Sequence, residues 1–176
     1  VEYWVDNGER VAVLAVDPSS PRSGGALLAD RMRMDSTDSG DSVFLRSLAT
    51  RGHPGGVSHF LSPMTDLLCY CGWSRIIIET VGSGQAETRI IAFADRVLMV
   101  DGPDRGDIIQ AEKAGIIELA DIIAVNKSDK PGAKRAADSI RSSLELGNGK
   151  NPPQVHLVSA HNSLGIEELA VAIEKC

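Results

Sequence analysis

One short polar segment carries the sharpest chemical signal in the sequence: Asn126-Lys127-Ser128-Asp129 directly follows an apolar run. A guanine base presents its ring N–H and its exocyclic amine side by side, and one carboxylate can accept both hydrogen bonds. Adenine offers no such pair of donors. If this segment bound such a base, Asp129 would accept the two donors, Asn126 would join the loop to the base edge, and the Lys127 stem would cover one face of the ring.

A second polar pair, Ser159-Ala160, follows the last apolar run of the chain. We expect this loop to offer a backbone N–H to the guanine carbonyl. An alternative for the first segment is a solvated turn with Asp129 as a helix cap, because Pro131 stands where helices often begin.

The elements that must position these residues are short apolar runs that recur between longer helical stretches. Parallel strands covered by helices on both faces have this pattern, without polar alternation. The sequence thus predicts an α/β fold with a mostly parallel sheet. The predicted strands are Val11–Val16, Ser42–Leu48, Arg75–Thr80, Arg96–Val100, Asp121–Asn126 and Val155–Ser159; the predicted helices are Val57–Gly72, Gln85–Phe93, Gly106–Leu119, Gly132–Leu146 and Ile166–Glu174.

Polar side chains stand where these strands end: Asp17, Glu79, Asp101, Asn126 and Ser159. In open α/β sheets the ligand binds at the carboxyl ends of the strands. One ligand site at that edge is the expectation. Each carboxylate alone also fits a simple turn or helix cap.

Composition narrows the classes of function. The chain has 176 residues, a net charge of −6 and 43% apolar residues, which suits one domain with a single core, residues 1–176. An acidic balance argues against a broad nucleic-acid-binding face. The apolar runs are too short to cross a membrane, so we expect a cytoplasmic protein without a nucleic acid or membrane partner.

Three cysteines, Cys69, Cys71 and Cys176, favour a reducing compartment. A zinc site at the Cys-x-Cys pair is an alternative, but no nearby His or third Cys completes a tetrahedral set. We expect ordinary thiols, buried or half-buried.

A family resemblance extends over nearly the whole chain. Asn126–Asp129 matches the Asn-Lys-x-Asp motif of GTP-binding proteins, and with the other segments it resembles MeaB/ArgK/MMAA-type GTPases, which are chaperones of methylmalonyl-CoA mutase. The segments are Val11–Ser20, Gly24-Gly25 with Asp30, Gly55-Gly56-Val57, Ile78–Gln85, Gly106-Asp107 with Gln110, and Glu118–Asp121.

The resemblance implies a P-loop NTPase-like three-layer sandwich that takes GTP or GDP with Mg²⁺. Asp17 and Glu79 would hold the metal as hard oxygen ligands. Asp30 would lie near the metal or the attacking water, Gly82 would donate its N–H to the γ-phosphate, and Gln85 would orient water. Residues 18–35 and 81–88 would be the switches.

Four arginines and one histidine elsewhere in the sequence are not assigned a functional role. The arginines Arg22, Arg31, Arg33 and Arg46 could contact phosphate or a partner, but most lone arginines are solvated or paired. His53 has no Ser or Cys partner that would make it a catalytic base.

No Gly-x-x-x-x-Gly-Lys-Ser/Thr phosphate loop occurs in the 176 residues, and Val1–Arg10 reads as the end of a helix. We therefore expect an amino-terminally truncated GTPase that lacks its first strand and its phosphate loop. Such a chain should bind GTP weakly and hydrolyse it near background. Two strands would lack their shared neighbour, which favours reduced stability or self-association.

The leading hypothesis is a GTPase that assists cofactor loading or protection of a cobalamin-dependent acyl-CoA mutase, with a homodimer as the form of the intact protein. One alternative is a non-catalytic interaction module that keeps the GTPase fold. Another is nickel delivery by a related GTPase, although the expected His- and Cys-rich clusters are absent from the sequence.

Overall fold

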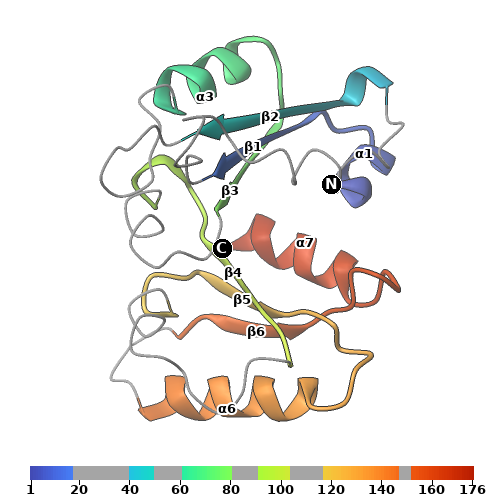
Figure 1. Cartoon of the computed structure of the whole chain (residues 1–176), viewed down its shortest axis with the longest axis vertical. Coiled ribbons are helices and arrows are strands. Elements are labelled where there is room, and N and C mark those ends of the chain that lie inside the picture. The colour runs from blue at the N-terminus through green and yellow to red at the C-terminus, as the bar shows by residue number, and fades with distance from the viewer. Residues whose placement is uncertain (18–39, 50–60, 81–90, 104–116, 147–151) are drawn as a thin grey trace, which may run out of the picture. The chain divides into compact units, whose positions relative to one another are not determined.

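The computed structural model describes residues 1–17, 40–49, 61–80, 91–103, 117–146 and 152–176. They belong to two compact units, Val1–Ala94 and Asp95–Cys176, and each is described by itself. Each unit holds a parallel three-stranded sheet with helices (Figure 1). The predicted α/β class is therefore confirmed, but the six strands form two sheets of three within the described residues.

In the first unit, β1 (Val11–Asp17) lies between β2 (Val43–Ala49) and β3 (Arg75–Thr80). All three strands are parallel, and Val11 is opposite both Val43 and Arg75. The helices of this unit are α1 (Glu2–Asp6) and α3 (Leu61–Tyr70), with single 3-10 turns at Gly40–Ser42 and Ile91–Phe93.

The central strand β1 explains why its sequence is apolar without alternation. Val11 to Val16 are buried on both faces of the sheet. Leu14 and Val16 belong to a cluster with Leu61 and Leu68 of α3, which covers one face (Figure 1). Leu61 and Leu68 are seven positions apart, so they lie on the same side of the helix.

The short helix α1 contacts this sheet through Arg75 of β3. The Arg75 guanidinium lies 5.6 Å from the Trp4 ring centroid and forms an ion pair with Glu9, beyond the helix, at 3.0 Å. The Arg10 guanidinium, just before β1, lies 4.3 Å from the ring centroid of Trp73, just before β3. Cation–π pairs of this kind use the long arginine stem as packing surface as well as its charge.

In the second unit, β5 (Ile122–Val125) lies between β4 (Leu98–Asp101) and β6 (Gln154–Leu157). The strands are parallel, with Ile122 of β5 opposite Leu98 and Gln154. The helices α6 (Ala133–Leu146) and α7 (Ile166–Lys175) lie on opposite faces of this sheet (Figure 1).

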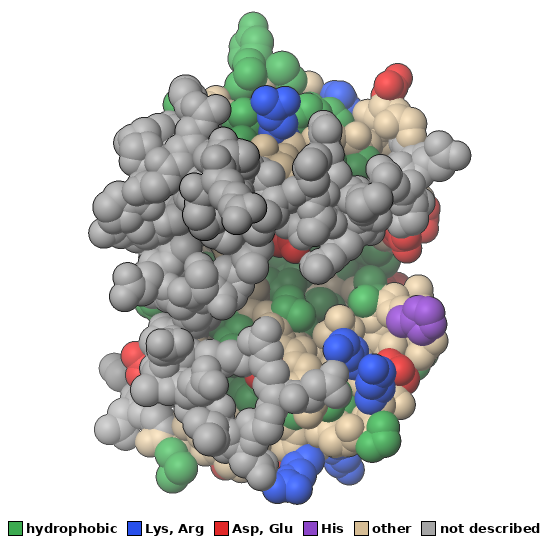
Figure 2. All heavy atoms as spheres, in the orientation of Figure 1, with side chains coloured by type: hydrophobic (Ala, Val, Ile, Leu, Met, Phe, Trp, Pro, Cys, Tyr) green, Lys and Arg blue, Asp and Glu red, His purple; other side chains and the backbone are tan. Residues whose placement is uncertain are grey.

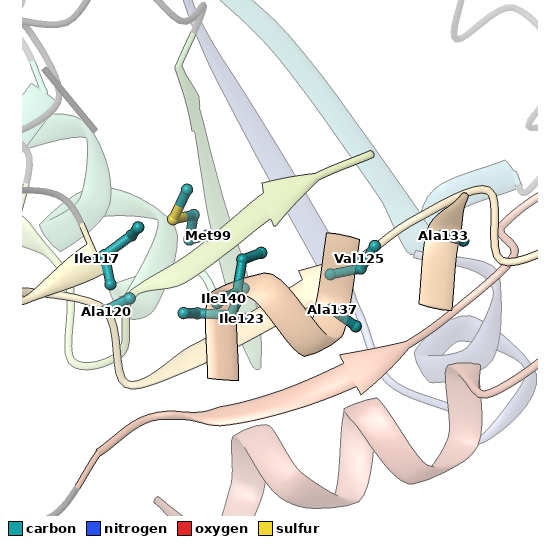
Figure 3. Packing of buried hydrophobic residues seen from close by; sticks show 8 residues of the cluster. All are labelled: Met99, Ile117, Ala120, Ile123, Val125, Ala133, Ala137 and Ile140. Carbon is teal, nitrogen blue, oxygen red and sulfur yellow. The ribbon is translucent and has the colours of Figure 1, made fainter. Parts of the chain in front are cut away.

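The side of α6 that faces the sheet is small and apolar. Ala133, Ala137 and Ile140 recur at helical spacing and pack against Ile123 and Val125 of β5 (Figure 3). On the other face of the sheet, Ile122 and Ala124 pack with Leu169 of α7. The strand β5 is thus buried on both sides, and it carries the predicted motif at its carboxyl end.

The predicted strand and helix bounds differ from the observed ones by one or two residues for most elements. At β4 the difference at the start is two residues, because the strand begins at Leu98 instead of Arg96, and the described part of α3 begins at Leu61. The predicted helices Gln85–Phe93 and Gly106–Leu119 lie mainly outside the described residues.

The expected burial of the cysteines was wrong, because Cys69, Cys71 and Cys176 are free and exposed. Cys69 follows the buried Leu68 on α3 and so points about 100° away from the sheet-facing side. Cys71 lies just beyond the helix end. Within the described ranges, no helix is long and apolar enough to cross a membrane.

Candidate functional site

The carboxyl end of β5 and the loop after β6 meet in the second unit. The backbone N–H of Asn126 donates to Asp101 O at the end of β4 (2.8 Å), and Ser128 N–H donates to Val158 O after β6 (2.9 Å). Neighbouring parallel strands end at the same edge, so three separate segments converge here.

Asn126 holds the two loops together through its side chain. Its Oδ1 accepts hydrogen bonds from the N–H of Lys127 (2.7 Å) and the N–H of Ala160 (3.0 Å). The Ala160 N–H is one of the two backbone donors of the Ser159-Ala160 loop, which the sequence analysis expects to face the guanine carbonyl, and in this structure it donates to Asn126. A base that bonds Ala160 has to compete with the Asn126 amide oxygen or share the donor with it.

Lys127 stands in a left-handed backbone conformation, with φ of 59°. This region is uncommon for residues other than glycine and is most often found in turns and functional sites. The Lys127 carbonyl accepts from Lys130 N–H at 2.9 Å, which closes a tight turn ahead of α6. The side chain of Lys127 is exposed.

Residues 126–129 and 159–160 together form what we call the rim. Asp129 is exposed there, and the Ser159 hydroxyl donates to its Oδ1 at 2.5 Å. This hydrogen bond is the main cause that lowers the pKa of Asp129, with smaller contributions from its own backbone N–H and from the charges of His161 and Lys130. An ionised carboxylate is a pure acceptor. At neutral pH Asp129 can therefore accept two adjacent N–H donors from a ligand.

The loop after β6 has its own fixed geometry. Ser159 is fully buried, and it exchanges backbone hydrogen bonds with Leu164 at 3.0 and 3.1 Å. Gly165 follows with φ of 69°, where an added Cβ would meet the Leu157 carbonyl oxygen at 2.6 Å. Sequence reasoning did not single out Gly165; its only signal was a glycine directly before an apolar helical segment.

The residues predicted to hold magnesium belong to the first unit. Glu79 is exposed on β3 and is paired with Ala15 in the register of β1. Asp17 is the last residue of β1, so both residues lie near the carboxyl edge of neighbouring strands. The Asp17 side chain is outside the described residues. In the part of the chain that the structure describes, no group of three or more His, Cys, Asp or Glu could hold a metal ion.

Of the remaining residues considered in the sequence analysis, one lies in the described part of the chain. Arg46 is exposed on β2, opposite Leu14 of β1. The others lie outside the described residues: Arg22, Asp30, Arg31, Arg33, His53, Gly82 and Gln85.

The family model described as "Methylmalonyl Co-A mutase-associated GTPase MeaB" matches residues 1–176. The chain belongs to the MeaB family. The resemblance read from the motifs is thereby confirmed.

Several relatives of this member of the MeaB family carry GTPase names. A provisionally named GTPase of Pyrococcus abyssi is 42% identical over 90% of this chain and 51% of its own length. GTPase ArgK of Escherichia coli is 34% identical over 96% of this chain and 53% of its length. The mouse protein "Methylmalonic aciduria type A homolog, mitochondrial" is 36% identical over 93% and 41%. The chain spans about half the length of the curated relatives it matches.

Solved structures that resemble this member of the MeaB family in fold include that of a HypB protein. The crystal structure of HypB from Helicobacter pylori in complex with nickel superposes with a TM-score of 0.63, at 14% identity, over 96% of this chain and 74% of that one. At this identity the match shows the fold alone, and the nickel belongs to that protein.

Proposed function

We propose that this chain is part of a guanine-nucleotide switch in which the rim at residues 126–129 and 159–160 binds the base. The observation that carries the proposal is the exposed, ionised Asp129 carboxylate at the carboxyl edge of the sheet. It lies beside the hydrogen bond from Ala160 N–H to Asn126 Oδ1, which joins the two loops. A fixed carboxylate accepts the ring N–H and the exocyclic amine of guanine together, and adenine cannot satisfy it.

We further propose that the intact protein hydrolyses GTP and assists a cobalamin-dependent acyl-CoA mutase in cofactor loading or protection. Support for the hydrolysis comes from the family and from relatives that carry GTPase names. Support for the mutase comes from the family description, which names methylmalonyl-CoA mutase.

A magnesium ion would be held by Asp17 and Glu79 at the carboxyl edge of the first sheet, where it would neutralise phosphate charge. The support is the position of both residues at the ends of adjacent parallel strands. Oxygen donors of this kind suit magnesium better than nickel or zinc.

The test of base recognition is Asp129→Asn. An amide in place of the carboxylate sets its NH₂ group against the two guanine donors, whereas the C2 carbonyl of xanthine can accept from it. We expect the variant to lose at least about tenfold in GDP affinity and to gain affinity for XDP. The measurement is a titration of the protein NMR spectrum with GDP, XDP and ADP in the presence of magnesium, which suits weak binding.

The matched control is Asp138→Asn, an equal change of charge at an exposed position of α6. It should leave the GDP affinity unchanged. A wild-type chain that binds ADP as well as GDP, or an Asp129→Asn variant that keeps GDP affinity, would refute the proposed guanine site.

A further inference from the structure

The outer face of α3 is apolar, although it faces solvent. Leu61 and Leu68 are buried against the sheet, whereas Tyr70 is 90% exposed. Tyr70 follows Leu68 by two positions, so its side chain leaves the helix about 200° away from the buried side. Pro63, Leu67 and Tyr70 are spaced by four and three residues, so they form one exposed stripe along the helix. In Figure 2, apolar side chains stand out over α3, at the top of the face drawn.

The composition of α3 is unusual for a helix that borders solvent. Asp66 is the one charged residue among its ten. The outward side of α6, by contrast, carries exposed charged residues, namely Lys134, Arg135, Asp138, Arg141 and Glu145. A helix that is apolar on all sides is normally covered, and an exposed apolar area on a folded domain usually marks an interaction surface.

Arg46 of β2 extends this surface. Phe44 and Leu48, two positions before and after it, pack in the cluster that contains Leu61 of α3. Residues two apart on a strand point to the same face of the sheet, so Arg46 lies on the face that α3 covers, and it is exposed there. Within the described residues, neither the Arg46 nor the Asp66 side chain has a hydrogen bond or an ion pair. We call Arg46 and the exposed residues of α3 together the α3 surface.

The features of the α3 surface favour a second copy of the chain as its partner. A two-fold interface brings the same surface of both copies together, so that surface must be complementary to itself. An apolar stripe meets this condition, and one acidic and one basic residue beside it can pair crosswise between the copies. Homodimer interfaces are also more apolar than the rest of the surface, and their centres are poor in charged residues.

We propose that two copies of this chain associate through their α3 surfaces, with the apolar stripes in contact and Asp66 of each copy close to Arg46 of the partner subunit. The proposal does not depend on the guanine site. A helix of ten residues is about 15 Å long, and a standard interface buries about 800 Å² per partner. The contact is therefore small, and we expect a weak dimer with a Kd on the order of 100 µM.

The first test removes the most exposed apolar side chain. In sedimentation velocity over a range of concentrations around the expected Kd, Tyr70→Ala should raise the Kd of the dimer about tenfold, because aromatic side chains at interface centres contribute most to affinity. Leu146→Ala is the matched control, because Leu146 of α6 is 87% exposed and lies outside the α3 surface. It should leave the Kd unchanged.

The second test exchanges the two charges. Arg46→Glu and Asp66→Lys should each raise the Kd about fivefold, because each places like charges opposite one another. The double variant Arg46→Glu with Asp66→Lys should return to within about twofold of the wild-type Kd, since the pair is restored with its signs reversed. Circular dichroism checks that each variant is folded. Association through another apolar surface would not show this rescue.

The outcomes separate the possible partners. Weakening by Tyr70→Ala together with rescue in the double variant supports the proposal. A double variant that dimerises no better than the single variants, or a Tyr70→Ala variant with the wild-type Kd, overturns it. A wild-type chain that is monomeric over the whole range also overturns it, and the α3 surface would then belong to contacts with a different protein.

Discussion

At the scale of single residues, the rim and the turn that follows it combine two backbone conformations that most residues avoid. Lys127 has φ of 59° in the turn after β5, where its side chain makes this conformation unfavourable, and Gly165 has φ of 69° at the N-cap of α7, where glycine adopts it at little cost. The unfavourable conformation of Lys127 persists only where neighbouring contacts enforce it. Here the contacts are the hydrogen bonds that the Asn126 side chain accepts from Lys127 and Ala160.

Gly165→Ala should destabilise the second unit by about 2–4 kcal/mol, since the new Cβ adds steric conflict to an unfavourable φ. The conflict is with the Leu157 carbonyl oxygen, 2.6 Å from the ideal Cβ position. Urea denaturation measures the change. Gly132→Ala is the control, because Gly132 also has positive φ (93°) but its nearest neighbour is 3.7 Å away. Equal losses in the two variants would show that the contact with Leu157 does not matter.

At the scale of elements, α6 packs on the sheet through three buried side chains, Ala133, Ala137 and Ile140. Ile140 is the largest of its buried side chains, at 4% exposure, and it packs against β5 in the cluster of Figure 3. Because residues 126–130 connect the end of β5 to α6, the packing of α6 on the sheet determines the position of this loop.

Ile140→Ala should lower the free energy of unfolding by about 2–4 kcal/mol through lost burial and an unfilled cavity. Leu146→Ala removes a similar side chain from the same helix at a position that is 87% exposed, and it should cost less than about 0.5 kcal/mol. Denaturant unfolding followed by circular dichroism gives both values. If the two variants lost the same stability, the assigned packing face of α6 would be incorrect.

At the scale of the whole molecule, four strands pair on one side only within the described residues. The strands β2 and β3 pair only with β1, and the strands β4 and β6 pair only with β5. Val100 of β4 is 58% exposed, and Leu98 two positions away is 39% exposed. Unpaired, apolar strand edges promote association between chains. On the face drawn in Figure 2, acidic, basic and apolar side chains of the described residues are interspersed.

Val100→Lys should reduce concentration-dependent self-association, because a buried interface would have to desolvate the new charge. Sedimentation velocity over a range of protein concentrations measures the effect. Leu164→Lys is matched in exposure, at 56%, but lies in a loop away from this strand, so it should change little. A wild-type chain that stays monomeric at high concentration would contradict the prediction.

Hydrolysis is a property of the whole molecule as well. The 176 residues contain no Gly-x-x-x-x-Gly-Lys-Ser/Thr loop, the usual source of backbone donors and of the lysine that contact the phosphates. We therefore expect this chain alone to hydrolyse GTP at nearly the uncatalysed rate. A phosphate-release assay with purified chain tests this, and a turnover comparable with that of intact GTPases would prove it wrong.

The sequence by itself determined the α/β class, all six strands to within two residues, and the position of the Asn126–Asp129 segment after a buried strand. These features are local. Apolar runs, turn residues and helical spacing reflect interactions between residues close in the sequence, so strands, turns and helices can be predicted from them.

Only the tertiary structure decided how the rim is assembled. The Ser159 to Asp129 bond spans thirty residues and the Asn126 to Ala160 bond thirty-four, and no local pattern fixes such pairs. The same holds for Gly165, whose side-chain space is closed by the carbonyl of a preceding strand. The sequence supplies the chemical groups, but the packing of α6 and α7 on one sheet sets the distances between them.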